Sequence, residues 1–408
     1  MTQKIKQLPQ GWQEVKLGEV CEIVSGSTPS THKSEYWNGE INWVTPAEIS
    51  DEHNWYYGNT VKKITKKGIE SSSVTLFPKG TVMLTSRAPI GKVAIADREM
   101  CSNQGFKNFI CNTKQLNPEY LYFWFRLKKE YLNSIGHGAT FKEISKGIVA
   151  NLKIPLPFKD GHPDLNAQRR IVSILEKAEK LKQRCAEADE LTKDYLQSVF
   201  GEMFLSNKDK KNWQELPLSE VVELNPKKSE LGKVEENTKV TFLRMEDIGE
   251  RGEIFNKTKK EISEVIKGYT YFNKNDILFA KITPCMENGK GAIAIIDTKI
   301  GFGSTEFHVL RPIKDKSTSE WIYYLLSLKP IREQAKKNMT GSAGQKRVPA
   351  SFFDILMVHL PPLPLQQKFA KIVERVEKLK EAQEKSREKI DELFNSLMQR
   401  AFNGELVI

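Results

Sequence analysis

The chain contains the same sequence pattern twice. Residues 12–20 (WQEVKLGEV) recur as residues 213–221 (WQELPLSEV), and residues 118–124 (PEYLYFW) recur as residues 319–325 (SEWIYYL). Both pairs are displaced by 201 positions, and two later pairs of segments keep the same order with displacements of 204 and 198. An ordered set of matches over nearly the whole length indicates a duplication. The fold of this chain must therefore contain two copies of the same structural unit.

Each copy is predicted to contain a mixed α/β body followed by one long helix. Apolar runs at 81–85, 93–96 and 276–280 indicate strands, which Gly and Pro interrupt. The Asn-Pro-Glu sequence at 117–119 is a helix start, so a helix is expected from there to about residue 135. The predicted fold class is α+β, as a tandem repeat of two α/β bodies with a long helix after each.

The two long helices have apolar or small residues at alternating spacings of three and four. In the first copy these positions run from Ile171 to Val199, and in the second from Phe369 to Leu397. This seam predicts a coiled coil of about four heptads, with the two helices as antiparallel partners. The alternative is that each helix packs only on its own body.

The positive charge of the chain resides in two blocks that match the two bodies. Lys and Arg exceed Asp and Glu by 6 in residues 1–160 and by 5 in residues 206–365, whereas 161–205 and 366–408 are nearly neutral. The expected organisation is therefore a body at 1–160, a central helix at 161–205, a second body at 206–365 and a C-terminal helix at 366–408. A net charge of +11 shared between two bodies indicates a polyanionic partner that is contacted twice.

The sequence lacks the motifs of a self-contained enzyme. Residues 86–93 (SRAPIGKV) are the nearest match to a phosphate-binding loop, but the first Gly and the hydroxyl after Lys92 are missing. The six histidines form no HExxH array and the five cysteines include no CxxC pair, so neither a metal site nor a disulfide framework is expected. No apolar run approaches the roughly 20 residues of a membrane helix, and we expect a cytoplasmic protein without membrane contact.

The motifs that remain occur in a characteristic order. They are LPQGWQEVKL at 8–17, GATFKEI at 138–144, IPLP at 154–157, LPP at 360–362 and AFNGEL at 401–406. With the two long helices, this ordered set resembles the specificity subunit (HsdS) of type I restriction-modification systems over essentially the whole chain. One departure is the missing Glu of the family pattern before each helix, where the sequence reads NAQ and PLQQ.

The resemblance implies a non-catalytic subunit with two target recognition domains, each reading one half of a split double-stranded DNA target. The paired helices would hold the domains apart and dock modification (methyltransferase) subunits, two per chain, in a complex that includes a restriction (nuclease and translocase) subunit. No cofactor is expected in this chain, and S-adenosylmethionine, ATP and magnesium are expected on the partner subunits. Two alternatives stay open: a self-contained DNA-modifying enzyme with an unrecognised active site, and a basic coiled-coil scaffold.

Sequence readout needs polar and cationic side chains on rigid loops. Two Gly-rich basic loops, at 136–142 and 340–348, meet that description, and so do several strand ends and turns. The side chains predicted to contact DNA are Thr85, Ser86, Arg87, Lys92, Asn103, Gln104, Thr140, Lys142, Lys281, Thr283, Lys290, Ser304, Thr305, Gln345, Lys346 and Arg347. The sequence does not determine which bases they read.

Overall fold

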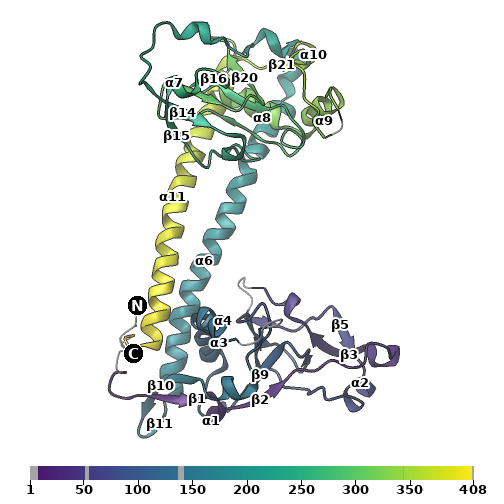
Figure 1. Ribbon diagram of the computed structural model, residues 1–408, viewed down its shortest axis with the longest axis vertical. Coiled ribbons are helices and arrows are strands. Elements are labelled where there is room, and N and C mark those ends of the chain that lie inside the picture. The colour runs from purple at the N-terminus through teal and green to yellow at the C-terminus, as the bar shows by residue number, and fades with distance from the viewer. Residues whose placement is uncertain (1–7, 51–54, 137–141, 343, 407–408) are drawn as a thin grey trace. The chain divides into compact units, whose positions relative to one another are not determined.

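The chain forms two compact units. The computed structural model describes residues 8–50, 55–136, 142–342 and 344–406. Unit 1 comprises Met1–Ala188 and Gln383–Ile408, and unit 2 comprises Asp189–Ala382. Each unit contains one α/β body and one end of each of the two long helices, α6 and α11 (Figure 1).

The body of unit 1 is built on three sheets. Their strand orders are β2-β9-β6-β7-β4, β5-β3-β8 and β1-β10-β11. The strands are β1 (Trp12–Lys16), β2 (Cys21–Ser25), β3 (Trp37–Val44), β4 (Tyr56–Tyr57), β5 (Lys62–Ile64), β6 (Val82–Thr85), β7 (Val93–Ala96), β8 (Cys101–Ser102), β9 (Phe106–Cys111), β10 (Lys153–Lys159) and β11 (His162–Pro163). The helices are α1 (Leu17–Val20), α2 (Lys66–Glu70), α3 (Pro118–Leu127), α4 (Lys129–Ile135), α5 (Lys146–Ala150) and the first part of α6 (Leu165–Phe200).

The body of unit 2 repeats this plan. Its strand orders are β13-β20-β17-β18, β15-β14-β19-β16 and β12-β21. The strands are β12 (Gln214–Pro217), β13 (Val222–Leu224), β14 (Lys239–Leu243), β15 (Thr258–Glu261), β16 (Thr270–Asn273), β17 (Ile277–Ala280), β18 (Gly291–Ile293), β19 (Ile300–Gly303), β20 (Phe307–Pro312) and β21 (Met357–Leu360). The helices are α7 (Ile262–Val265), α8 (Ser319–Ser327), α9 (Lys329–Lys337), α10 (Phe352–Ile355) and the first part of α11 (Leu363–Phe402).

The strand pairings confirm the duplication. In unit 1, β2, β9, β6 and β7 are antiparallel neighbours, and in unit 2 so are β13, β20, β17 and β18. The parallel pair β3–β8 likewise corresponds to the parallel pair β14–β19. The strands predicted at 81–85, 93–96 and 276–280 are β6, β7 and β17, all fully buried.

The aromatic helix predicted after the Asn-Pro-Glu motif is present. The Asn117 side chain accepts a hydrogen bond from Tyr120 N at 2.8 Å, so it caps α3, and α4 ends at Ile135 as expected. The structure differs from the prediction of one continuous helix, since the helix breaks at Lys128 between α3 and α4. In unit 2 the Thr318 side chain accepts from the N–H of Trp321 and caps α8.

Within unit 1, the first part of α6 packs against the last part of α11. Leu175 of α6 and Met398 of α11 belong to the same buried cluster. Lys182 Nζ also lies 2.6 Å from Asp391 Oδ1, which joins the two helices at the protein surface. The start of one helix therefore meets the end of the other.

Within unit 2, the last part of α6 packs against the first part of α11. The rings of Phe200 and Phe369 are 5.4 Å apart, and Leu196 and Val376 belong to the same buried cluster. The helices thus run antiparallel, as predicted from the tandem repeat.

The seam itself is less buried than its spacing predicted. Leu181 and Leu393 in unit 1 remain 43% and 49% exposed, and Leu379 in unit 2 remains 51% exposed. The fully buried positions, such as Leu175, belong to the clusters that include α3 or α8. The reason is that an aromatic-rich body removes more apolar surface from water than a single neighbouring helix does.

Candidate nucleic-acid interface

Three segments of unit 1 meet at one end of its sheets. Ser86 N, just after β6, donates a hydrogen bond at 2.7 Å to Gly105 O in the turn between β8 and β9. Ile144 N, just before α5, donates at 2.9 Å to Ser86 O. We define residues 85–89, 103–105 and 142–144 as the interface of unit 1. Backbone hydrogen bonds hold this surface together, so its side chains project from a rigid frame.

Unit 2 forms the same surface with the same backbone bonds. Lys281 N donates at 2.9 Å to Glu306 O, and Val348 N donates at 2.9 Å to Lys281 O. The interface of unit 2 is accordingly defined as residues 280–284, 304–306 and 345–348. Both interfaces include a cis X-Pro bond in their first segment.

A carboxylate lies at the centre of the unit 1 interface. Glu143 Oε2 accepts from Arg87 Nε at 2.8 Å, and Glu143 Oε1 accepts from Lys107 Nζ at 3.1 Å. Burial raises the pKa of Glu143, but the hydrogen bonds from Arg87 and Lys107 outweigh it and leave this pKa below its ordinary value. The Glu143 carboxylate therefore stays ionised at neutral pH.

A carboxylate also lies at the centre of the unit 2 interface. Glu306 Oε2 accepts from Arg347 Nε at 2.9 Å, and Glu306 Oε1 accepts from Arg347 Nη2 at 2.8 Å. These hydrogen bonds lower the pKa of Glu306. On β20, His308 takes the place that Lys107 has on β9. His308 is buried with Nε2 2.8 Å from Val348 O, and burial lowers its pKa.

Four of the predicted DNA contacts are engaged inside the protein. The hydroxyls of Thr85 and Ser86 and the ammonium groups of Lys92 and Lys290 donate to backbone carbonyl oxygens, at distances between 2.7 and 3.2 Å. Thr85 and Ser86 are also fully buried. These side chains close the loops around the interface, and their contact with DNA stays a prediction.

Five of the predicted side chains are exposed around the central ion pairs. They are Gln104 and Lys142 in unit 1, and Thr305, Gln345 and Lys346 in unit 2. The structure therefore brings together polar side chains that are far apart in the sequence. Thr140 lies outside the described residues.

The remaining six predicted side chains are half-buried, and two of them, Arg87 and Arg347, form the central ion pairs. Asn103 Oδ1 accepts from Gly105 N at 2.9 Å, and Ser304 Oγ accepts from Glu306 N at 3.2 Å, so both shape their turns. The other two are Lys281 and Thr283 of unit 2. Their position at the interface is shown, and a role in DNA contact remains a prediction.

A family model described as the type I restriction modification DNA specificity domain matches the chain twice, at residues 9–190 and at residues 210–392. Together the two matches span most of the sequence. The chain belongs to this family. The resemblance inferred from the sequence motifs is confirmed, and so is the expectation of a non-catalytic DNA specificity subunit.

One relative of this specificity-domain chain matches most of its length, and another matches less than half of it. It is 29% identical over 395 residues to the type I restriction enzyme MjaIX specificity subunit of Methanocaldococcus jannaschii, covering 91% of this chain and 88% of the relative. It is 35% identical over 193 residues to the EcoEI specificity subunit of Escherichia coli, covering 45% of this chain and 32% of that relative.

Solved structures of the specificity family share the fold. One, described as showing complex assembly and conformational transition of the type I R-M system, matches with a TM-score of 0.63 at 21% identity, covering 98% of this chain and 100% of that one. The type I S subunit from M. genitalium matches with a TM-score of 0.53 at 15% identity, covering 98% of each chain. The tandem α/β architecture with a long helix after each body is thus confirmed.

Two lysine pairs of the specificity domains were missed by the sequence reasoning. Lys62 and Lys63 lie on β5, and Lys259 and Lys260 lie on β15, each the edge strand of its sheet. Lys62 pairs in register with Trp43, next to the end of β3 at the interface. A Lys-Lys pair that recurs 197 positions later was the signal available in the sequence. Cations on an edge strand suit contact with phosphates, so these lysines are further predicted DNA contacts.

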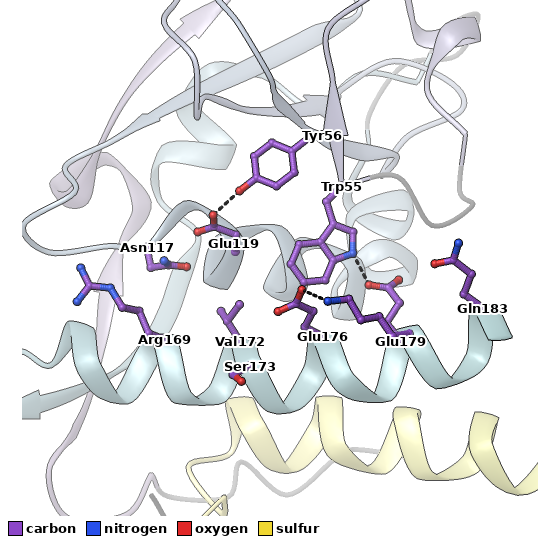
Figure 2. Close-up of a pocket in the computed structure, with 11 residues that line it drawn as sticks. Trp55, Tyr56, Asn117, Glu119, Arg169, Val172, Ser173, Glu176, Glu179 and Gln183 are labelled. Carbon is purple, nitrogen blue, oxygen red and sulfur yellow. Dashed lines mark hydrogen bonds and ion pairs between the residues drawn. The ribbon is translucent and has the colours of Figure 1, made fainter.

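Unit 1 of the specificity chain also contains a pocket of about 540 Å³ beside α6 (Figure 2). Six of its side chains pair with one another: Tyr56 with Glu119, Trp55 with Glu179, and Lys180 with Glu176 at 2.7 Å. Three carboxylates in one pocket disfavour the approach of a phosphate backbone. We therefore place the nucleic-acid interface at the loops and not in this pocket.

In the part of the chain that the structure describes, no group of three or more His, Cys, Asp or Glu side chains could hold a metal ion. No described helix is both long enough and apolar enough to cross a membrane.

Proposed function

We propose that this chain reads a bipartite double-stranded DNA target, with each unit reading one half through its interface. The observation that supports this most strongly is the repetition of the interface, because the same three segments are joined by equivalent backbone hydrogen bonds in both units. A rigid surface that presents amide, hydroxyl and cationic groups suits recognition of base edges. Two such surfaces suit a target in two parts.

The chain acts as one subunit of a type I restriction-modification complex. Two modification subunits that bind S-adenosylmethionine dock on it, and a restriction subunit supplies ATP- and magnesium-dependent chemistry. Family membership and the naming of the relatives as specificity subunits support this assignment. The half-exposed leucines Leu181, Leu379 and Leu393 of α6 and α11 offer apolar surface for docking. The complex meets its DNA in the cytoplasm.

The experiment is reconstitution of this chain with a type I modification subunit. The purified complex should methylate a duplex that contains the bipartite target, whereas this chain alone should methylate nothing. Methylation by the chain without a partner would favour a self-contained enzyme and contradict the proposal. Weak binding with no preference for any sequence would favour a basic scaffold.

A pair of lysine variants tests the position of the interface. Lys346→Ala should weaken duplex binding and lower the slope of log affinity against log salt by about 1, because one phosphate contact is lost. The matched control is Lys299→Ala, since Lys299 is also exposed but precedes β19, at the end of the strand away from the interface. Equal effects of the two substitutions would contradict the placement of the interface.

A further inference from the structure

An arginine–carboxylate pair occupies the centre of each interface, but the two pairs are built from different positions. In unit 1 the arginine, Arg87, follows β6, and its partner Glu143 precedes α5. In unit 2 the arginine, Arg347, precedes α10, and its partner Glu306 lies in the turn between β19 and β20. The position equivalent to Glu143 is thus occupied by Arg347, as the matching bridges Arg87↔Glu143 and Ile282↔Arg347 indicate. An arginine–carboxylate pair thus lies at the same site in both units, although its two residues come from different positions of the fold.

Folding stability does not explain this recurrence. The arginine side chains are 43% and 41% exposed, and their carboxylate partners are 33% and 24% exposed. Ion pairs with this much exposure contribute about 0–1 kcal/mol. The backbone bonds already hold the segments together, so a further role for the side chains has to be sought at the surface.

The geometry of each guanidinium leaves hydrogen-bond donors available. Arg347 directs Nε and Nη2 to Glu306, and Nη1 donates to Gln345 O at 3.0 Å. A guanidinium has five N–H groups, so Nη1 and Nη2 each keep one. Arg87 donates through Nε to Glu143, and within the described residues its Nη1 and Nη2 have no protein acceptor. In both units a pair of terminal N–H groups remains for an external partner.

The chemistry of the pair favours a base over a phosphate. The ionised carboxylate offsets positive charge, that of Arg347 in unit 2 and part of that of Arg87 and the buried Lys107 in unit 1, so the site gains less from a phosphate than an unpaired arginine would. The carboxylate also restricts the guanidinium plane, which lowers the entropy lost when the arginine binds a planar edge. Two parallel N–H donors match the O6 and N7 acceptors of guanine in the major groove.

We propose that Arg87 and Arg347 each recognise one guanine through O6 and N7, with Glu143 and Glu306 as positioning residues. This inference rests on the proposed function, because it assumes that each unit reads one half of the target. Each half-site is then expected to contain a G·C pair whose recognition depends on one arginine, Arg87 or Arg347.

The test uses the complex of the full chain with its modification subunit and a duplex library in which both half-sites are randomised in turn. The wild-type complex should prefer guanine at one position of each half-site by about 5- to 150-fold. Arg347→Met should abolish the preference at one position of one half-site and leave every other position unchanged. Arg87→Met should do the same at one position of the other half-site. The half-site that is not altered serves as an internal control for folding and assembly.

The positioning residues are tested by conservative replacement. Glu306→Gln keeps the arginine and the size of the side chain, so it should reduce the guanine preference at the same position that Arg347→Met affects. A purely structural role would instead lower methylation of all sequences equally, and that result would overturn the inference. The matched control is Arg251→Met, because Arg251 is also exposed and paired, with Asp194, but lies outside the interface. It should leave the preference intact.

Different results would contradict this inference and the proposed function. If the wild-type complex shows a bipartite target but no position in either half-site loses its guanine preference in the arginine variants, the inference alone is wrong. If the wild-type complex shows no bipartite target, the proposed function is wrong and the inference falls with it.

Discussion

A buried ion pair joins two helices in unit 1 and contacts a third, and its removal should give a large and measurable loss of stability. Arg126 of α3 pairs with Glu179 of α6, and the Glu179 side chain is 4% exposed. Glu179 also accepts from the indole N–H of Trp55. The Arg126 guanidinium lies 5.5 Å from the ring of Phe394, which belongs to α11. Arg126→Met would therefore remove the guanidinium that pairs with this buried carboxylate.

The expected cost follows from that burial. Removing one partner of a buried ion pair destabilises a protein by about 3–5 kcal/mol. For a folded unit of this size, that corresponds to a decrease in midpoint temperature of about 6–20 °C. Arg126→Met with Glu179→Gln should recover more than half of the loss, because no buried charge remains and a neutral acceptor still faces Trp55.

The measurement is hydrogen exchange of the purified chain at increasing urea concentration, with peptides of each unit followed separately. Unit 1 should lose stability and unit 2 should not. The matched control is Lys380→Met, because Lys380 pairs with Glu377 at the equivalent place on α11 but both side chains are about 40% exposed. It should cost about 0–1 kcal/mol. If the double variant cost as much as Arg126→Met and Glu179→Gln measured separately and added together, Arg126 and Glu179 would not be coupled and the prediction would be wrong.

Three further predictions concern pH, a buried arginine and helix length. Burial lowers the pKa of His308, so its contribution to stability is fully present above the ordinary pKa of 6.5 and should be lost progressively as the pH falls from 6.5 through the lower pKa of the folded state. Urea unfolding of wild type and His308→Gln would show this loss as a slope of unfolding free energy against pH that only wild type has. Arg332 is 7% exposed and donates to two backbone carbonyl oxygens of the loop after Pro284. Arg332→Ala should therefore destabilise unit 2 by about 2–4 kcal/mol in the urea assay, and a cost below about 1 kcal/mol would contradict this. Because α6 begins in unit 1 and ends in unit 2, four residues inserted near Cys185 should lengthen this helix by about 6 Å. The unread spacer of the DNA target should then lengthen by one or two base pairs, which methylome sequencing would reveal.

Much of the fold could be predicted from the sequence because its signals are local or repeated. The α3 helix start depends on Asn117 and its neighbours, and the strand β7 depends on an unbroken apolar run. The duplication allowed each element to be checked against a second copy. Burial of the helix seam could not be predicted in this way, because the exposure of Leu181 and Leu393 depends on how each body covers the helices.

The candidate site could be predicted as a set of loops but not as a set of contacts. Arg347 and Glu306 are 41 positions apart, and only the folded sheet brings them together. Comparison of the two copies could not reveal the pairs either, because Arg87 corresponds in the fold to Ile282, which has no charge. Lys92 and Lys290 were predicted to contact DNA, and the sequence could not show that both ammonium groups donate to backbone carbonyl oxygens.

The central claim is that each unit reads its own half of a bipartite target, and exchange of one body tests it most directly. Residues 14–150 would be replaced by the corresponding segment of a relative whose target differs, and the methylated sequences of cells that contain the hybrid complex would be determined. We expect one half-site to change to that of the relative, while the other half-site and the spacer length stay as they were. A hybrid complex that is active but changes both half-sites together, or neither, would contradict it.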